Sequence, residues 1–318
     1  MKILIISGFL GAGKTTFIKN LIKRTGKEFV VLENEYASTD VDEQVLTSED
    51  DARVWDLTEG CICCTKSADL NASIVTIEST LEPEYLIVEP SGVGALSNVI
   101  RNLQKIEYDR ITLLRPVTIL DAVNFHHDLK AFEDVYKDQI RVAGTIVISK
   151  PENLSGEAYR QVYEAVHSIN PDAEVLSRHY TQMPQEWWDD LLRTTYSGKI
   201  LQEVDETQLD LETCTIWDGA VRSPVELLWV LEKAVAGGYG RVVRGKGIIK
   251  SGNEWLRYDI AGGMIAITGF DGTDETTRPE CVFIGNALDR FALMAELHAP
   301  GLKMRNKPAA AGRGKIRV

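Results

Sequence analysis

The sequence lacks several features that would place the chain in a special class of protein. No apolar run approaches the roughly 20 residues that a membrane-spanning helix needs. The five cysteines in 318 residues are too few for the disulfide framework of a small secreted protein. Positive charge is also in deficit, because the formal net charge is −12 and such a surface repels phosphate backbones. We therefore expect a cytoplasmic protein with no membrane and no nucleic-acid partner.

The first half of the chain alternates short apolar runs with longer amphipathic stretches. The runs are near-continuously apolar, which is typical of parallel strands covered on both faces. This alternation predicts a doubly wound, mainly parallel α/β sheet. The expected strands are 2–7, 29–33, 54–57, 85–89, 117–121, 145–149 and 173–177, and the expected helices are 14–24, 70–81, 96–105, 132–143 and 162–169.

The pattern changes after an acidic, weakly periodic stretch at residues 203–211. Beyond it the sequence predicts a smaller α+β domain with antiparallel strands at 214–217, 241–249, 254–260, 264–270 and 281–285, and helices at 224–236 and 287–297. We therefore divide the chain into a first domain at 1–205, a second at 206–303 and a basic tail at 304–318. The tail is rich in Gly and Ala, and we expect it to be disordered.

Residues 8–15 read GFLGAGKT and match the pattern G-x-x-x-x-G-K-[ST] at every fixed position. A strand is expected before the motif and a helix after it, as a phosphate-binding loop requires. The glycines let backbone N–H groups turn inward, and the helix N-terminus adds positive potential. Lys14 is then expected to reach the β- and γ-phosphates, and the Thr15 hydroxyl to ligate Mg²⁺. A simple glycine turn does not explain the complete motif, so we predict a triphosphate site.

Three of the five cysteines, Cys61, Cys63 and Cys64, lie together in the segment GCICC at residues 60–64. Thiolates select zinc and other soft or borderline metals, and three of them leave one position of a tetrahedral zinc site open. A closed structural site would want a fourth Cys or His nearby, and none follows. From the residues alone, a metal site and a cluster of buried or redox-active thiols are equally open. The isolated Cys214 and Cys281 read as small core residues.

Together the phosphate loop and the cysteine segment resemble the motifs of the CobW-type GTPases, relatives of the HypB and UreG metallochaperones. The resemblance extends over nearly the whole chain and includes LIVEPSG at 86–92, which is similar to the family's Walker B segment. The other segments that carry it are ENEY at 33–36, followed by Val41 and Asp42, VTILDA at 117–122, DQI at 138–140, RGKG at 244–247 and VFIG at 282–285.

The resemblance implies a P-loop GTPase domain followed by the smaller α+β domain. It implies GTP and Mg²⁺ as cofactors, zinc or cobalt as the metal, slow turnover, and release of metal to a metalloprotein or cobalamin-related client; a homodimer stays open. The residues expected to act are Lys14, Glu89 and Asp42 in catalysis, Gly11, Ala12, Gly13, Lys14, Thr15, Thr16, Lys150 and Glu152 in nucleotide binding, and Cys61, Cys63, Cys64, Thr15 and Glu33 in metal binding.

The segment expected to bind the base departs from the guanine motif N-K-x-D, because residues 149–152 read SKPE. Glu152 keeps a carboxylate but is one methylene longer than Asp, and Ser149 replaces the Asn that orders the loop. Lys150 can still lie along the base plane. GTP therefore stays the expected nucleotide, with a looser preference over ATP. The group that positions Mg²⁺ or the attacking water stays open between Glu89 and Asp42.

Two other functions stay open on the sequence. A nucleotide-gated regulatory or reactivation factor for a cobalamin-dependent enzyme would use the same switch without carrying metal. An ATP-dependent small-molecule kinase would keep the phosphate loop but leave the cysteines unexplained. Two residue pairs have simpler interpretations. His126-His127 reads as an exposed pair on an acidic loop, and Trp187-Trp188 reads as a packing element or an interface.

Overall fold

The computed structural model of the chain describes residues 1–33, 52–56, 67–176, 178–198, 211–270 and 278–297. Asp42 and the cysteines Cys61, Cys63 and Cys64 lie outside the described residues, as do the boundary at 205/206 and the tail 304–318. These expectations stay predictions. Across the described ranges, no helix is both long enough and apolar enough to cross a membrane.

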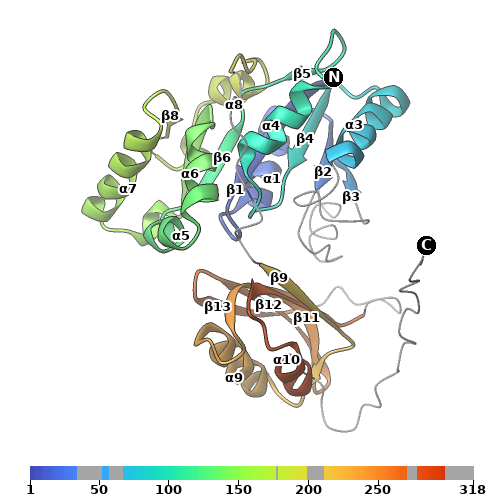
Figure 1. The fold of residues 1–318 in the computed structure, drawn as a ribbon, viewed down its shortest axis with the longest axis vertical. Helices are drawn as coiled ribbons and strands as arrows, with labels where there is room; N and C mark the ends of the chain where they lie inside the picture. Colours follow the sequence, from blue (N-terminus) through green and yellow to red (C-terminus); the bar gives the residue numbers. More distant parts are fainter. Residues whose placement is uncertain (34–51, 57–66, 177, 199–210, 271–277, 298–318) are drawn as a thin grey trace, which may run out of the picture.

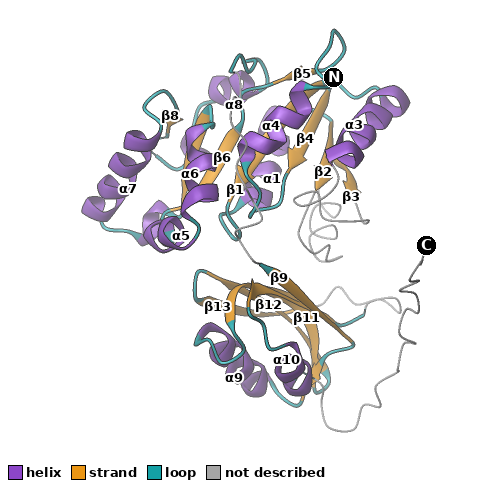
Figure 2. Ribbon diagram, in the orientation of Figure 1, coloured by secondary structure: helices purple, strands orange, loops and turns teal. Residues whose placement is uncertain are grey.

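A parallel sheet organises the first half of the chain (Figures 1 and 2). Its strands follow the order β3-β2-β4-β1-β6-β7-β8, and β5 pairs with β1. Every pairing within it is parallel, as the apolar runs predict. The strands are β1 (Lys2–Gly8), β2 (Phe29–Glu33), β3 (Ala52–Asp56), β4 (Tyr85–Glu89), β5 (Thr112–Leu113), β6 (Val117–Asp121), β7 (Thr145–Ser149) and β8 (Glu174–Val175).

Helices cover both faces of this sheet, which confirms the doubly wound α/β class. Alternate residues of β1 point to opposite faces. Leu4 and Ile6 therefore join one buried cluster, while Ile3 and Ile5 join another. The helices are α1 (Lys14–Thr25), α3 (Ser67–Leu81), α4 (Leu96–Gln104), α5 (Phe125–Ala131), α6 (Glu133–Arg141), α7 (Gly156–Ile169) and α8 (Gln185–Leu191), with 3-10 turns at η1 (Pro151–Asn153) and η2 (Tyr180–Gln182).

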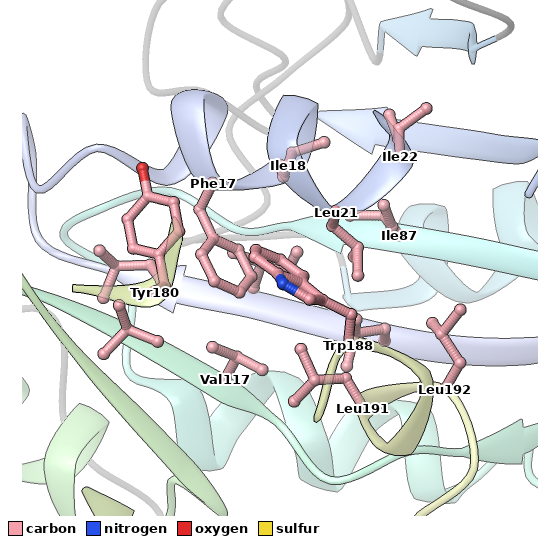
Figure 3. Packing of buried hydrophobic residues seen from close by; sticks show 14 of the residues in the cluster. Phe17, Ile18, Leu21, Ile22, Ile87, Val117, Tyr180, Trp188, Leu191 and Leu192 are labelled. Carbon is pink, nitrogen blue, oxygen red and sulfur yellow. The ribbon is translucent and has the colours of Figure 1, made fainter. Parts of the chain in front are cut away.

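The tryptophan pair anchors the cluster beneath the phosphate loop. Figure 3 shows Trp188 against Phe17 of α1, with Tyr180 beside them. Trp188 is fully buried, and its ring centroid lies 5.4 Å from that of Phe17. The predicted packing role is confirmed, and it ties α8 to the first helix after the loop.

The histidine pair lies on helix α5, where the sequence predicted a loop. His126 and His127 are exposed as expected, but Phe125 and Asp128 are buried and hold a short helix against the domain. Asp121 stabilises its start, because its Oδ1 accepts hydrogen bonds from the backbone N–H groups of Val123 and Asn124. Seven residues are too few for a clear helical period, so the sequence pattern missed this helix.

A second sheet organises the C-terminal half, with strand order β13-β12-β11-β14-β9 and antiparallel pairing throughout this order. Strand β10 pairs in parallel with β11. The predicted α+β class is confirmed, and Cys214 and Cys281 are buried as expected. The elements are β9 (Glu212–Trp217), β10 (Ala220–Val221), α9 (Pro224–Val235), β11 (Arg241–Ser251), β12 (Glu254–Ala261), β13 (Met264–Gly269), β14 (Glu280–Asn286) and α10 (Arg290–Glu296).

The second sheet lies between its own helices and the first domain (Figure 1). Along β14, Cys281 and Phe283 join the cluster formed with α9 and α10. The alternate residues Val282 and Ile284 join a cluster that contains Phe9 of the phosphate loop. One face of the C-terminal sheet therefore packs on the domain that carries the loop.

Candidate functional site

The loop between β1 and α1 adopts a backbone that requires glycine. Gly8, Gly11 and Gly13 have φ angles of 144°, 76° and 99°, in the left-handed half of the φ range. A Cβ atom at Gly8 would also lie 2.3 Å from the carbonyl oxygen of Ile119 on the neighbouring strand β6. The loop therefore passes so close to β6 that no side chain fits at Gly8. This geometry suits the inward-pointing N–H groups of an anion cradle.

Two charged side chains meet where β4 and the loop adjoin. Lys14 begins α1 and is only 8% exposed, and its Nζ lies 3.6 Å from Oε1 of Glu89 at the end of β4. These groups meet because β1 and β4 are neighbours and the carboxyl ends of parallel strands share one edge of the sheet. Glu33 ends β2 at the same edge, in register with Glu89. Thr15 and Thr16 follow on the first turn of α1.

The Walker B segment after β4 is fixed against the phosphate loop by its backbone. A Cβ atom at Gly92 would lie 2.8 Å from the backbone nitrogen of Leu10. The buried side chain of Gln139 on α6 donates hydrogen bonds to the carbonyl oxygens of Gly92, at 3.2 Å, and Gly94, at 2.9 Å. A movement of this segment would therefore be transmitted to the loop.

The SKPE segment holds the phosphate loop from the other side. The Ser149 hydroxyl donates to the carbonyl oxygen of Ala12 at 2.7 Å. The Lys150 ammonium donates to the carbonyl oxygen of Gly11 at 3.1 Å and forms an ion pair with Asp121, whose Oδ2 lies 2.7 Å away. Ser149 thus orders the loop, which is the role expected of the missing Asn. Its neighbour Glu152 is exposed on η1 and is not among the residues that line the cavity described next.

A cavity of ≈ 540 Å³ opens above the phosphate loop between the two halves of the chain. It brings together most residues that the sequence assigned to the nucleotide, and Ala12 lies buried beneath them. Five basic side chains and two carboxylates line it, so this site is locally positive although the chain is acidic. The lining residues are Gly11, Gly13, Lys14, Thr15, Thr16, Lys19, Glu89 and Lys150 from the first domain, and Arg244, Arg257, Asp259, Ala261, Met264, Ile265 and Ala266 from the second.

Three residues in or around the cavity, Asp121, Gln139 and Arg244, have no role in the sequence interpretation. Asp121 and Gln139 belong to segments that resemble the family, but their hydrogen bonds join residues 29 to 47 positions apart. Arg244 opens the RGKG segment, yet nothing in that pattern indicates which side of the sheet it faces. Among the residues that the structure describes, no group of three or more His, Cys, Asp or Glu side chains is placed to hold a metal ion.

The chain is similar to proteins named as zinc chaperones. YjiA of Escherichia coli (strain K12) is 27% identical over 179 residues, which cover 54% of this chain and 55% of that protein. The zinc chaperone CobW of Sinorhizobium sp is 29% identical over 197 residues, which cover 52% of this chain and 54% of that protein. The chain thus matches about half the length of these curated relatives. The solved structure of Zn(II)-bound YjiA GTPase from E. coli is 21% identical and covers 93% of this chain and 97% of that chain, with a TM-score of 0.45.

One protein-family model matches the part of the chain that contains the phosphate loop, the Walker B segment and the SKPE segment. It is described as CobW/HypB/UreG, nucleotide-binding domain, and it matches residues 2–177, which is more than half of the 318 residues. The resemblance of the sequence motifs is thereby confirmed. The chain belongs to the CobW/HypB/UreG family.

Proposed function

We propose that the protein is a GTP-binding and GTP-hydrolysing metallochaperone that binds zinc, or cobalt, through its cysteine segment and delivers the metal to a client protein. The observation that carries the nucleotide part is the positive cavity over the phosphate loop. Its lysines and the threonines of α1 are the donor set that a triphosphate with Mg²⁺ needs. The relatives named as zinc chaperones support the metal part.

Within this proposal the side chains that line the cavity have definite tasks. Lys14 binds phosphate oxygens, and the Thr15 hydroxyl holds Mg²⁺, which together with GTP supplies the phosphoryl chemistry when bound. Phosphate oxygens compete with Glu89 for the Lys14 ammonium, since Nζ and Oε1 are only 3.6 Å apart. Phosphate binding would therefore weaken this ion pair, and Glu89 would be one of the carboxylates that could position Mg²⁺ or the attacking water. Lys150 lies along the base, and its bond to Gly11 couples base recognition to the loop.

The metal part rests on the chain order of the motifs. Cys61, Cys63 and Cys64 lie between the phosphate loop and the Walker B strand, so a rearrangement driven by the γ-phosphate can change their spacing. Three thiolates bind zinc tightly and leave one position for a ligand from the client. Glu33 is proposed as a further oxygen ligand of this metal site, and Asp42 stays the alternative to Glu89 for positioning Mg²⁺ or the attacking water.

Competitive zinc titration with a chromophoric chelator tests the proposal. We expect the protein to bind about one zinc ion tightly, as three thiolates with one open position predict, and its affinity to change when GMPPNP and Mg²⁺ are added. The triple variant Cys61→Ser, Cys63→Ser, Cys64→Ser should lose this site. The control variant Cys214→Ala removes a thiol that is buried in the C-terminal core and should bind zinc like the unsubstituted protein.

Two results would contradict the metallochaperone. Absence of zinc binding in both nucleotide states favours the regulatory factor, which uses the nucleotide switch without metal. Equal zinc affinity in the triple variant and the unsubstituted protein would place the metal away from the cysteine segment. Phosphate transfer from ATP to a small acceptor, with no zinc bound, would favour the kinase.

A further inference from the structure

One arginine of the C-terminal sheet is directed at the phosphate loop. Arg244 lies on β11 opposite Ile284 of β14, which packs on the first domain. Residues directly opposite in an antiparallel pair share a face of the sheet. Arg244 therefore also faces the first domain, away from α9 and α10.

An irregularity in β11 sets this direction. The pairing of β11 with β14 shifts between Val242 and Arg244, so Val243 is an extra residue in the strand. A β-bulge of this kind re-aims the side chains beside it. Val243 joins the cluster that contains Phe9 of the loop, and Arg244 follows it on the same side. The bulge thus puts two consecutive residues on the face that meets the nucleotide site.

The Arg244 guanidinium lies at the surface of the loop. A Cβ atom at Gly11 would lie 2.6 Å from its Nη1 and 2.7 Å from the Cβ of Ala261. Its Nη2 donates to Asp259 Oδ2 at 3.0 Å, and the side chain is only 14% exposed. Its Nε is buried and has no hydrogen-bond partner in the described part of the chain. Arg244 lines the cavity that already holds Lys14 and Lys150, and its guanidinium carries N–H donors beyond the one that Asp259 engages.

We propose that Arg244 is a nucleotide-contacting residue, which the C-terminal domain supplies to the triphosphate in the same chain. This inference rests on the proposed nucleotide function and adds the second domain to the site. Arginine presents several N–H donors in a planar fork that matches phosphate oxygens. Asp259 holds this fork in place beside Gly11 and competes with phosphate for one of its donors.

The arrangement makes the position of the C-terminal sheet depend on the nucleotide. With triphosphate bound, Arg244 links the phosphates to β11. The neighbouring residue Val243 packs in the cluster that contains Phe9, so β11 contacts the phosphate loop at two consecutive residues. A diphosphate offers fewer oxygens and holds the sheet less firmly. The C-terminal domain therefore senses which nucleotide is present, through one side chain that contacts it.

Equilibrium binding of the fluorescent N-methylanthraniloyl derivative of GMPPNP, with Mg²⁺, tests the contact. Arg244→Ala should weaken binding about 10- to 100-fold, the loss typical of a charge-assisted hydrogen bond. Arg244→Lys keeps the charge without the fork and should recover part of the loss. The matched control is Arg222→Ala, because Arg222 is 73% exposed in the same domain and forms an ion pair with Glu226, four residues along the chain. It should bind within about twofold of the unsubstituted protein.

Hydrogen–deuterium exchange of the unsubstituted protein keeps the inference testable even if Arg244→Ala does not fold. GMPPNP with Mg²⁺ should slow exchange in β11 and β12 as well as in the phosphate loop, whereas GDP should protect these strands less. Two results would overturn the role of Arg244 without touching the proposed nucleotide function. One is equal affinity of Arg244→Ala and Arg222→Ala for the analogue, and the other is exchange in β11 and β12 that does not change when GMPPNP binds. Failure of the unsubstituted protein to bind the analogue would instead refute the proposed nucleotide function.

Discussion

At the scale of single residues, burial makes the two isolated cysteines, Cys214 and Cys281, unreactive. Burial raises the pKa of Cys281 to about 12 and also raises the pKa of Cys214. The reactive form is the thiolate, and at pH 9 only about a thousandth of a thiol with that pKa is ionised. Both side chains are also enclosed in the C-terminal core.

We therefore predict that Cys214 and Cys281 do not react with a thiol reagent while the protein is folded. In the variant Cys61→Ser, Cys63→Ser, Cys64→Ser, dithionitrobenzoate at pH 8 should label almost no thiol in native buffer. It should label both remaining thiols after unfolding in guanidinium chloride. Rapid labelling of the folded variant would show that one of the two is accessible, and thiol titrations could then no longer be assigned to the cysteine segment alone.

Ser149 shows how far a residue's role follows from the sequence. The pattern N-K-x-D predicts an Asn whose side-chain amide orders the loop, and Ser149 lacks that amide. In the structure the Ser149 hydroxyl makes the bond to Ala12 that orders the loop. The pattern could not predict this because a shorter side chain needs a closer backbone, and the approach of β7 to the loop is a tertiary property. Lys14 and Thr15 were predictable because the local strand–loop–helix motif alone determines their places.

At the scale of elements, helix α4 is capped by another helix rather than by its own residues. Its N-cap residue is Ala95, which has no side-chain hydrogen bond to offer. Instead Asp138 of α6 accepts a hydrogen bond from the Ser97 backbone N–H at 2.9 Å, and it is 2% exposed. The next residue, Gln139, holds the Walker B segment. One turn of α6 thus positions both α4 and the loop before it.

Asp138→Ala should lower the free energy of unfolding by about 1–2 kcal/mol, because it removes the only side-chain cap described for α4. Asp138→Asn keeps an acceptor oxygen and should cost less. Burial raises the pKa of Asp138, so its favourable contribution is complete below the ordinary value of 3.8 and is lost as the pH rises through the folded-state pKa. The stability of Asp138→Asn relative to the unsubstituted protein should therefore increase from pH 3.5 to pH 7.

Urea unfolding at several pH values measures both effects. The control is Asp134→Asn, an exposed carboxylate in the first turn of α6, which should change stability by no more than about 0.5 kcal/mol. If Asp138→Ala and Asp134→Asn are equally stable at pH 7, the bond to Ser97 does not cap α4. A constant difference between Asp138→Asn and the unsubstituted protein across the pH range would contradict the raised pKa.

Elements with a strong local pattern were predictable, whereas two short helices were not. The continuous apolar run of strand β7 (Thr145–Ser149) gave its bounds, and helix α9 (Pro224–Val235), with 12 residues, ends one residue before its predicted end. Helices α5 and α8 have seven residues each and were missed. In α8 the buried residues Trp187, Trp188 and Leu191 span little more than one turn, which is too short to distinguish a helix from an apolar loop.

At the scale of the whole molecule, the C-terminal domain forms one wall of the cavity over the phosphate loop. The sequence predicted both domains but not their contact, because residues far apart in the chain make it. Arg241 of β11 lies over the Phe132 ring at 5.4 Å, and the turn between β12 and β13 meets Asn124 after β6. Asn124 in turn donates to Asp121, the partner of Lys150. The second domain therefore touches the network that orders the phosphate loop.

Gly262 offers the sharpest test of this contact. It has a φ of 55°, and an added Cβ would lie 2.0 Å from Asn124 Cγ. Gly252, in the turn between β11 and β12, has a φ of 61°, but its added Cβ would lie 3.4 Å from the nearest described atom. Alanine at either position suffers the same backbone strain, on the order of 1 kcal/mol. Only Gly262→Ala also forces the turn and Asn124 apart.

We therefore expect Gly262→Ala to lose at least about 1 kcal/mol more stability in urea unfolding than Gly252→Ala, the usual minimum for overpacking a close contact. It should also bind GMPPNP more weakly, because displaced Asn124 no longer supports Asp121 and the bond of Lys150 to Gly11. Gly252→Ala should bind the analogue like the unsubstituted protein. Equal stability and equal nucleotide affinity of the two variants would mean that the C-terminal sheet does not rest on the first domain through this turn. A second result would identify the contact between Gly262 and Asn124 as a link between the domains. Nucleotide affinity would fall in Gly262→Ala but not in Gly252→Ala, and the double variant Gly262→Ala, Asn124→Ala would regain the stability that Gly262→Ala loses.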